Sequence, residues 1–474
     1  MIPLKRRMKS GIMAHATMAK QGKGQGDAAL DQHERMTTEP IRKLTLELGI
    51  PSMLSMVITT VYNLVDTWFV ARLGTQATAA VGISFAIMEM INSLGYLFGT
   101  GGGTRIGLLL GAKDRQSASE VGSTAAAAAL GLSLLFSAGG LAFLTPLMRL
   151  LGSTPTIQPY AEAYGRLILL GFPVMCLFIV LATFLRCEGK NRLSMIGMGL
   201  GGVLNMALDP LFIFGMGLGI AGAALATFLS QTVSLAVLLY FFISGKTETR
   251  LAPGAVRPNR RLLGRIICSG LPSLCRHGAG TLSSACLNIS AGMHGGDALI
   301  AALSIVSKVT AFILALLKGL FQGAQSVYSY NKGAGRGDRI RQAYDFTLRI
   351  NQIGICLIAA GMYFAAPAVL SLFSATDAET VALGVTALRC HTFGLILMPY
   401  GFSVNILLQA VGESGRSTFL ASLPQGLCFV PLVFLLPALF GVPGLMLTPG
   451  AAYLATDLIT IPYKKRFVDE RYRV

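Results

Sequence analysis

Long apolar runs recur along almost the whole chain, and they constrain its fold more than any other feature. Runs of about 20 or more residues follow one another from residue 44 to residue 463, and only 13% of all residues are charged. A soluble protein carries roughly a quarter charged residues. An apolar run of this length crosses a bilayer as an α-helix, in which every backbone polar group is bonded within the segment. Strand-like alternation typical of a membrane β-barrel is not apparent. We therefore predict an all-α polytopic membrane protein.

Twelve segments are predicted to cross the membrane, and an even number places both ends of the chain on one side. The segments are residues 44–70, 77–111, 119–144, 160–187, 191–214, 219–244, 262–292, 297–330, 341–366, 380–410, 415–440 and 441–463.

The basic residues gather in the loops on one side, which the positive-inside rule assigns to the cytoplasm. The net charge of +17 therefore reflects membrane topology rather than a nucleic-acid-binding patch. We expect both termini to be cytoplasmic, membrane lipids to surround the protein, and no nucleic-acid partner. The loops in question carry Arg42, Lys43, Lys113, Arg115, Lys190, Arg192, the stretch from Arg250 to Arg265, Lys332, Arg336, Arg339, Arg341, Arg416, Lys464, Lys465 and Arg466.

No motif typical of an enzyme, a cofactor site or a metal site is present. The eight cysteines form no Cys-x-x-Cys pair, and His277, His294 and His391 are isolated from one another. The glycine-rich run 99–104 lacks the Gly-Lys-Ser/Thr of a phosphate-binding loop. We expect no catalytic residues, no cofactor, and no metal other than sodium as a coupling ion.

The two halves of the chain repeat at an offset of about 222 residues. Gly49–Ser52 corresponds to Gly270–Ser273, and Pro210 corresponds to Pro431. Because each half holds about six segments, both halves enter the membrane in the same direction, as in parallel-repeat transporters. The expected domains are a disordered basic tail at 1–39, an N-terminal six-helix lobe at 40–244, a linker at 245–261, a C-terminal six-helix lobe at 262–463 and a basic tail at 464–474.

Three carboxylates lie inside apolar segments of the first half: Asp66, Glu89 and Asp209. A charge at the centre of a membrane helix costs roughly 2.5–3.5 kcal/mol, so such residues are usually functional. The corresponding positions of the second half are neutral. We therefore assign the titrating chemistry to the first lobe, with a structural polar contact as the alternative for Asp66.

Asn205 and Asp209 are four residues apart and share one helix face. Pro210 leaves a backbone carbonyl free one turn earlier, and that carbonyl can face a cation. The alternative places Asp209 at the end of its helix, solvated at the external surface.

Glu89 has two interpretations. It attracts a cationic substrate, or it pairs with a base such as Lys308 or Arg105. Lys308 and Lys318 are candidate counter-ions, but we expect them to extend to a membrane interface instead. Aromatic and methionine side chains near Glu89, including Tyr62 and Met88, are candidates for an adaptable substrate-binding wall.

Three stretches resemble the MATE (multidrug and toxic compound extrusion) transporters, and most of all their MepA-like branch. Residues 62–74 read YNLVDTWFVARLG, similar to the first-helix signature of that family. Residues 205–213 read NMALDPLFI and are followed by GLGIAGAALAT at 217–227. Residues 323–334 resemble the end of the eighth helix, although Gln325–Val327 stands where many relatives have a proline. The resemblance covers about residues 40–463.

The resemblance implies an inner-membrane antiporter of bacteria that exports organic cationic or amphiphilic compounds in exchange for protons or sodium. We expect the protein to be a monomer. It also implies a coupling-cation site formed by Asp66, Asn205, Asp209 and Thr227. The chain lacks the acids that one branch of the family carries in its seventh and tenth helices.

A lipid-linked oligosaccharide flippase of related architecture is the second candidate. Its cavity would need several buried arginines for a pyrophosphate head group, and Arg105, Arg276 and Arg389 are the available ones. The embedded acids of the first half favour cationic cargo instead.

Overall fold

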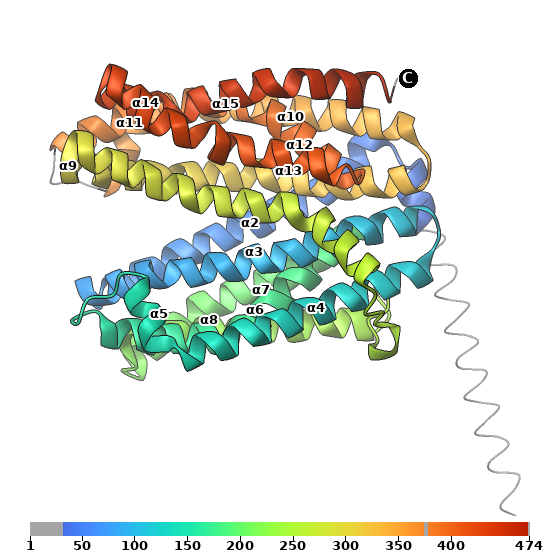
Figure 1. Cartoon of the computed structure of the whole chain (residues 1–474), viewed down its shortest axis with the longest axis horizontal. Helices are drawn as coiled ribbons and strands as arrows, with labels where there is room; N and C mark the ends of the chain where they lie inside the picture. Colours follow the sequence, from blue (N-terminus) through green and yellow to red (C-terminus); the bar gives the residue numbers. More distant parts are fainter. Residues whose placement is uncertain (1–31, 374–377, 473–474) are drawn as a thin grey trace, which may run out of the picture.

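The computed structural model describes residues 32–373 and 378–472, in which helices are the only regular secondary structure. The first bundle contains α2 (Ile41–Ala71), α3 (Thr75–Gly111), α4 (Arg115–Ala142), the short α5 (Leu144–Leu150), α6 (Gln158–Cys187), α7 (Asn191–Pro210) with the π-helical turn η1 (Leu211–Gly215), and α8 (Gly219–Ile243) (Figure 1).

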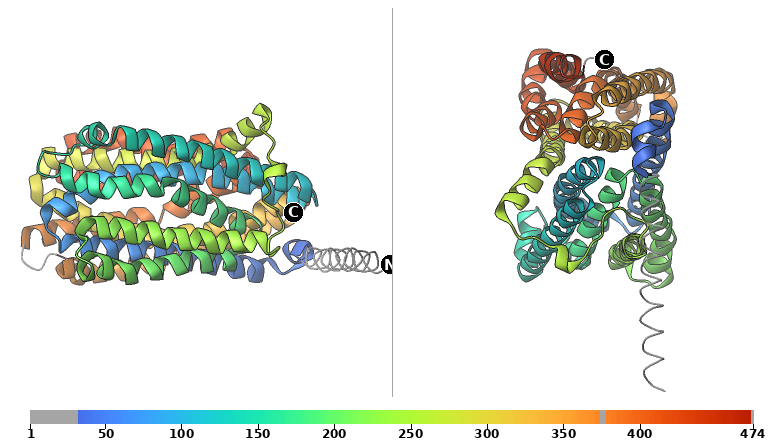
Figure 2. Two further views of the ribbon diagram at one scale, coloured as in Figure 1. Left: turned by 90° about the horizontal axis from the view of Figure 1, so that it is seen from below. Right: turned by 90° about the vertical axis from the view of Figure 1, so that its right-hand side faces the viewer.

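The second bundle repeats this arrangement. It contains α9 (Arg260–Gly333), α10 (Gly337–Phe373), α11 (Ala378–Leu395), α12 (Met398–Ala410), α13 (Ser414–Ser422), the π-helical turn η3 (Leu423–Leu427), α14 (Phe429–Phe440), α15 (Val442–Lys464) and the π-helical turn η4 (Lys465–Asp469). The linker between the bundles contains the 3-10 turn η2 (Pro253–Ala255). Figure 2 shows the two bundles from the side and end-on.

The described helices confirm an all-α, two-lobe membrane architecture. Ten of them are long and apolar enough to cross a membrane, and the pair α11 and α12, bent by 47°, gives an eleventh span. A non-helical Gly296 with φ of 61° divides α9 into two arms, the second of which is one of these ten spans. Only glycine adopts this backbone conformation readily, so the chain reverses there without strain.

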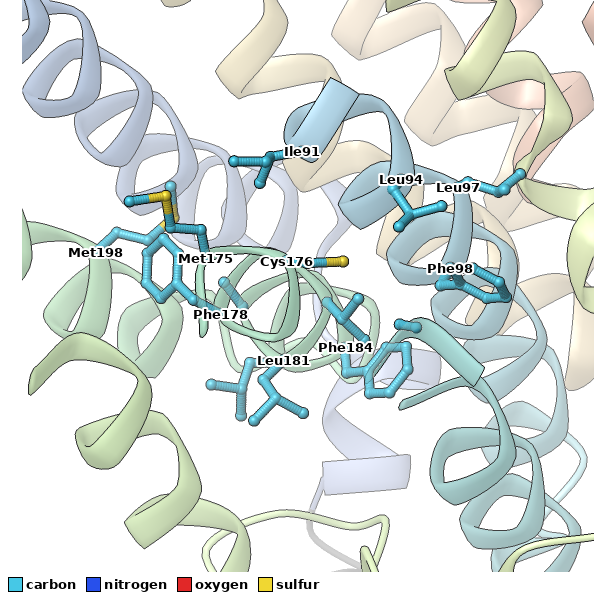
Figure 3. Close-up of a cluster of buried hydrophobic side chains, with 14 of the residues drawn as sticks. Ile91, Leu94, Leu97, Phe98, Met175, Cys176, Phe178, Leu181, Phe184 and Met198 are labelled. Atoms are coloured by element: carbon cyan, nitrogen blue, oxygen red, sulfur yellow. The ribbon is translucent and has the colours of Figure 1, made fainter. Parts of the chain in front are cut away.

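An apolar core holds the first bundle together between α3, α6 and α7. α6 is the most deeply buried of the candidate spans, because 67% of the residues in its most apolar stretch are buried. Large side chains from these three helices interdigitate in the cluster that Figure 3 shows, which includes Ile91, Leu94, Leu97, Phe98, Met175, Cys176, Phe178, Leu181, Phe184 and Met198. This packing provides a rigid wall on which the polar residues of α7 and α8 are positioned.

The two bundles touch at one end of the molecule, which we call the basic end because it carries the loops around Lys113, Lys190 and Gly335 and the linker 245–259. Here α2 and α3 cross α9 backbone against backbone, and the same apolar core continues from the first bundle into Phe321 and Tyr328. Glycines make this approach feasible, because a Cβ would meet backbone atoms of the facing helix. They stand at three crossings: Gly49 with Gly323, Gly101 with Gly270, and Gly111 with Gly333.

Residues 32–38 form a short helix that contacts both bundles at the basic end. The expectation of a disordered tail is therefore wrong for this part, while residues 1–31 lie outside the described residues. Met36 is fully buried, and its carbonyl accepts hydrogen bonds from Asn331 (3.1 Å) and Arg339 (3.5 Å) of the second bundle. Gln32 donates to the Glu188 carbonyl of the first bundle (3.2 Å).

The Glu188 side chain, just beyond the end of α6, fixes the linker to the first bundle. Its carboxylate accepts bonds from the backbone amides of Glu248 (2.9 Å) and Thr249 (3.2 Å) and from the Thr249 hydroxyl. Burial is the largest influence on this carboxyl and raises its pKa to about 7, although these donors act in the opposite direction. The folded-state pKa lies above the unfolded value, so the stability that this group contributes is complete below about pH 4.5 and is lost as the pH rises through 7.

We expect Glu188→Ala to release the linker. Each hydrogen bond to a charged group contributes about 1.5–3 kcal/mol, so losing this set should speed tryptic cleavage between Lys246 and Arg261 at least about tenfold. Limited proteolysis of the purified protein measures this rate. Glu120→Ala is the matched control, since Glu120 makes only a half-exposed 3.6 Å pair with Arg257. Equal cleavage rates for both variants would contradict the assignment.

Candidate coupling site and central cavity

Asp209 of α7 is fully buried, and only one of its carboxyl oxygens has a hydrogen-bond partner. Asn205, one turn earlier, donates from Nδ2 to Asp209 Oδ1 at 3.2 Å, while Oδ2 has none. The helix does not stop at Pro210, because the π-helical turn η1 follows it directly. The Asp209 side chain does not reach the surface. The alternative of a solvated carboxylate at the external end of the helix is therefore wrong.

Thr227 of α8 completes this hydrogen-bonded group. Asn205 Nδ2 also lies 3.4 Å from Thr227 Oγ1, and the Thr227 hydroxyl donates to the carbonyl of Ala223 (3.1 Å). The Asn205 amide oxygen remains buried without a partner. Helices α7 and α8 thus bring together three of the residues predicted from the sequence.

Asp66 of α2 lies near the same group. Its carboxyl group lies close enough to that of Asp209 for their negative charges to repel each other. Asp66 Oδ1 is buried without a hydrogen-bond partner. Tyr62, one turn earlier on α2, accepts a 3.4 Å hydrogen bond from Gln231 of α8. The buried Tyr164 of α6 is within electrostatic range of both carboxyl groups.

The sequence did not single out Gln231 or Tyr164. The four-residue step from Thr227 to Gln231 was an available signal, because it places both on one face of α8. Tyr164 had no such signal, since only the packing of α6 brings it to the site.

The chemistry of this cluster suits a proton or a small hard cation. It contains two carboxyl groups and two neutral oxygen donors, and within the described ranges no Lys, Arg or His forms an ion pair with either acid. Two negative charges buried side by side are costly, and a bound cation offsets that cost. Oxygen ligands are the ones that hard cations prefer. No group of three metal-ligating His, Cys, Asp or Glu side chains is found in the part of the chain that the structure describes.

A central cavity of about 490 Å³ lies between the two bundles. Glu89 lines it from α3, accepting a hydrogen bond from Asn92 (3.1 Å) and lying 3.6 Å from His277 Nδ1 of α9. The His277 ring stacks on Tyr96 at 4.8 Å. The base facing Glu89 is therefore His277, rather than Lys308 or Arg105.

A sequence model of the family described as MatE matches residues 51–211 and 279–435 of this chain. The chain belongs to the MatE family. The two matched stretches fall one in each bundle, in agreement with the repeat of about 222 residues, and they confirm the resemblance seen in the sequence motifs.

Two relatives of this MatE-family chain come from staphylococci. The multidrug export protein MepA of Staphylococcus aureus (strain MSSA476) is 28% identical over 436 residues, which cover 90% of this chain and 95% of the relative. The protein of the same name from Staphylococcus haemolyticus (strain JCSC1435) is 29% identical over 413 residues, covering 86% and 89% of the two chains.

Solved structures of the MatE family share the whole fold. A crystal structure of MATE in the straight conformation aligns with a TM-score of 0.88 at 25% identity, covering 93% of this chain and 99% of the other. The outward-facing conformation of a multidrug resistance MATE family transporter of the MOP superfamily aligns with the same TM-score and identity, covering 93% and 98%.

The remaining predicted substrate residues of this MatE-family chain lie away from the central cavity. Tyr62 faces the interior of the first bundle, and Met88 packs against its apolar core. Phe85 and Met56 line the cavity beside Glu89 instead.

The basic residues also differ from expectation. Lys318 lines the cavity together with Arg276 rather than extending to an interface. Arg105 lies in a separate basic depression near Arg265, and Arg389 donates to the Tyr363 carbonyl (3.3 Å) and lies over its ring.

The second lobe contains an embedded carboxylate that the sequence analysis overlooked. Asp457 of α15 accepts a 3.0 Å hydrogen bond from the Gly401 amide and lines a small pocket of about 40 Å³ with Arg276, Lys318 and Tyr453. The sequence did contain a signal for this residue, because Asp457 is a single acid within the apolar run 442–463. Embedded acids are therefore not confined to the first lobe.

Proposed function

We propose that this protein is a secondary-active multidrug exporter that moves small amphiphilic organic compounds across the membrane in exchange for protons or sodium. The observation that carries the proposal is the pair Asp66 and Asp209: each has one buried carboxyl oxygen without a hydrogen-bond partner, and neither forms an ion pair with a base among the described residues. The relatives named multidrug export protein support the choice of cargo.

In this proposal, a cation entering from outside neutralises the pair and allows α2 to change its bend. Pro51 lies inside α2 and removes one backbone hydrogen bond, so the helix flexes there at low cost. The turn before Pro51 packs against α9 through Gly49 and Gly323. A change in α2 would therefore reach the contact that closes the cavity at the basic end, as alternating access requires.

We further propose that the basic end is cytoplasmic and that one chain suffices for transport, because both lobes and the cavity lie within it. The alternative function, a lipid-linked oligosaccharide flippase, has less support. Of its three candidate arginines only Arg276 lines the cavity, while Arg105 and Arg389 lie elsewhere.

The test uses the full chain reconstituted in proteoliposomes with a fluorescent cationic dye. We expect dye movement under a proton gradient or a sodium gradient, each imposed separately, and none without a gradient. Dye movement at the same rate with and without each gradient would contradict ion coupling. Transfer of a labelled lipid-linked sugar in place of the dye would favour the flippase.

A further inference from the structure

A basic depression of about 800 Å³ lies at the basic end, where the first arm of α9 meets α3 and the start of α13. It is separate from the central cavity, and the two share no lining residue. Side chains of both lobes form it. Its five arginines are Arg105 of the first lobe and Arg260, Arg261, Arg265 and Arg416 of the second.

Acids of the protein compensate little of this positive charge. The one acid that lines the depression is Glu413, and its two carboxyl oxygens are paired with Arg416 (2.5 Å) and Arg471 (2.6 Å). Within residues 32–373 and 378–472, no Asp or Glu forms an ion pair with any of the other four arginines. Like charges gathered at a membrane repel one another, and a bound anion offsets that cost.

Arg105 extends its guanidinium across the boundary between the lobes. Its Nε donates to the Arg265 carbonyl at 3.1 Å, and the two side chains lie close enough for their positive charges to repel each other. The terminal nitrogens of Arg105 form no hydrogen bond with any other residue that the structure describes. A guanidinium presents five donors in a planar fork, so these nitrogens remain available to a phosphate group.

The depression lies near the ends of membrane helices, at the depth of lipid headgroups. α3 has 37 residues and is about 55 Å long, which exceeds the roughly 30 Å of the hydrocarbon layer. Arg105 lies about 9 Å along the axis from the end of this helix at Gly111. The other arginines lie in the first turns of α9 and of α13, and the candidate span Ser414–Phe440 begins with α13.

A mostly exposed apolar stripe runs from the depression along the first arm of α9. Cys268, Cys275, Leu282 and Ile289 follow Arg261 at steps of seven residues, which drift by only about 20° per step around a helix. Leu282 and Ile289 are about half exposed, at 52% and 56%. None of the four lines the central cavity. The stripe offers an acyl chain an apolar surface, which a soluble phosphate compound does not need.

We propose that this basic depression binds the phosphate headgroup of an anionic phospholipid, with one of its acyl chains lying along the stripe on α9. Basic pockets between membrane helices bind headgroups of this kind. Because arginines of both lobes contact the headgroup, the lipid connects the lobes at the basic end. Separation of the lobes there moves Arg105 away from the other four arginines, so the lipid stabilises the closed arrangement. This inference goes beyond the proposed export function and does not depend on it.

Native mass spectrometry of the full chain in detergent measures the affinity for each added lipid. We expect cardiolipin, which carries two phosphates, to bind at least about tenfold more tightly than zwitterionic phosphatidylcholine. Arg261→Gln and Arg265→Gln combined should remove this preference. Arg192→Gln is the matched control, because Arg192 is exposed at the start of α7 and lines no part of the depression. Equal affinities for the two lipids, or the same loss in Arg192→Gln, would overturn the proposal.

Arg105→Gln tests the connection between the lobes, since Arg105 is the contribution of the first lobe to the lining. We expect this variant to bind cardiolipin about tenfold more weakly, the effect of losing one charge-assisted contact. Thermal unfolding without lipid checks that the variant is folded. An unchanged affinity would mean that the lipid contacts the second lobe alone and would overturn the connection.

Cys268 reports on occupancy of the depression itself, because its thiol is exposed and lines it. N-ethylmaleimide should alkylate Cys268 about tenfold more slowly in nanodiscs that contain cardiolipin than in phosphatidylcholine nanodiscs, as expected for a site occupied about nine-tenths of the time. The combined Arg261 and Arg265 variant should react equally fast in both. Glycerol phosphate, a headgroup without acyl chains, should not protect Cys268. Protection by glycerol phosphate equal to that by cardiolipin would overturn the assignment to a lipid.

Discussion

Asp66→Asn and Asp209→Asn should each reduce ion-driven dye export about a hundredfold, because they remove the groups whose charge changes with the bound cation. A coupling free energy of 1–3 kcal/mol corresponds to roughly 5–150-fold, and the upper part of this range is expected for a site with unpaired oxygens on both acids. Both variants should fold, since an amide has the shape of a protonated carboxyl, and in Asp209→Asn the amide oxygen can still accept the hydrogen bond from Asn205. Dye-driven proton or sodium movement in proteoliposomes is the measurement.

The control for this pair is Glu120→Gln, the same chemical change at a carboxylate of the basic end that lies far from the cavity lining. Its export should equal that of the unmodified protein. Dye binding without a gradient should survive in Asp66→Asn. Full export by Asp66→Asn and Asp209→Asn would refute the proposed coupling site.

Gly270→Val should disable transport and lower the free energy of unfolding by about 1–3 kcal/mol, the usual range for an overpacked contact. A Cβ at this position would collide with the carbonyl of Leu97 on α3, and backbone atoms cannot move aside as a flexible side chain can. The two lobes could then no longer close at the basic end. Export assays and thermal unfolding in detergent measure the two effects.

Gly264→Val is the matched control on the same arm of α9, because nothing lies within 4 Å of a Cβ built at that position. Gly264→Val has the same cost in helix propensity of a β-branched residue as Gly270→Val, but its side chain collides with no backbone atom. Similar losses for both valine variants would show that helix propensity, rather than the crossing of α3 and α9, is responsible.

The sequence was sufficient for the features that depend on local pattern. Apolar runs predicted the membrane spans, the offset of the glycine and proline positions predicted two lobes, and a four-residue step predicted the contact of Asn205 with Asp209. Each of these follows from helix geometry within one segment or from a repeat of it.

Features that depend on distant segments could not be predicted in this way. The pairing of Glu89 with His277 joins helices of different lobes, and the sharing of one cavity by Arg276 and Lys318 depends on how the two arms of α9 lie. Asp457 was visible as an isolated acid, but only the structure places it beside these bases.

The attachment of the linker limits how far the lobes can separate. Beyond the contact with Glu188, the linker is bonded along α4: the amide of Arg250 donates to Ser119 (3.0 Å), that of Ala252 to Ser123 (3.2 Å), and that of Arg257 to Thr124 (2.9 Å). Only residues 258–259 then remain between the last of these bonds and the start of α9. An extended chain spans at most about 3.3–3.6 Å per residue, so this tether allows a gap of roughly 10 Å or less. If the linker bonds persist, the part of the basic end beside the linker must act as a pivot. The two lobes must then separate at the basic end by rotation around this point.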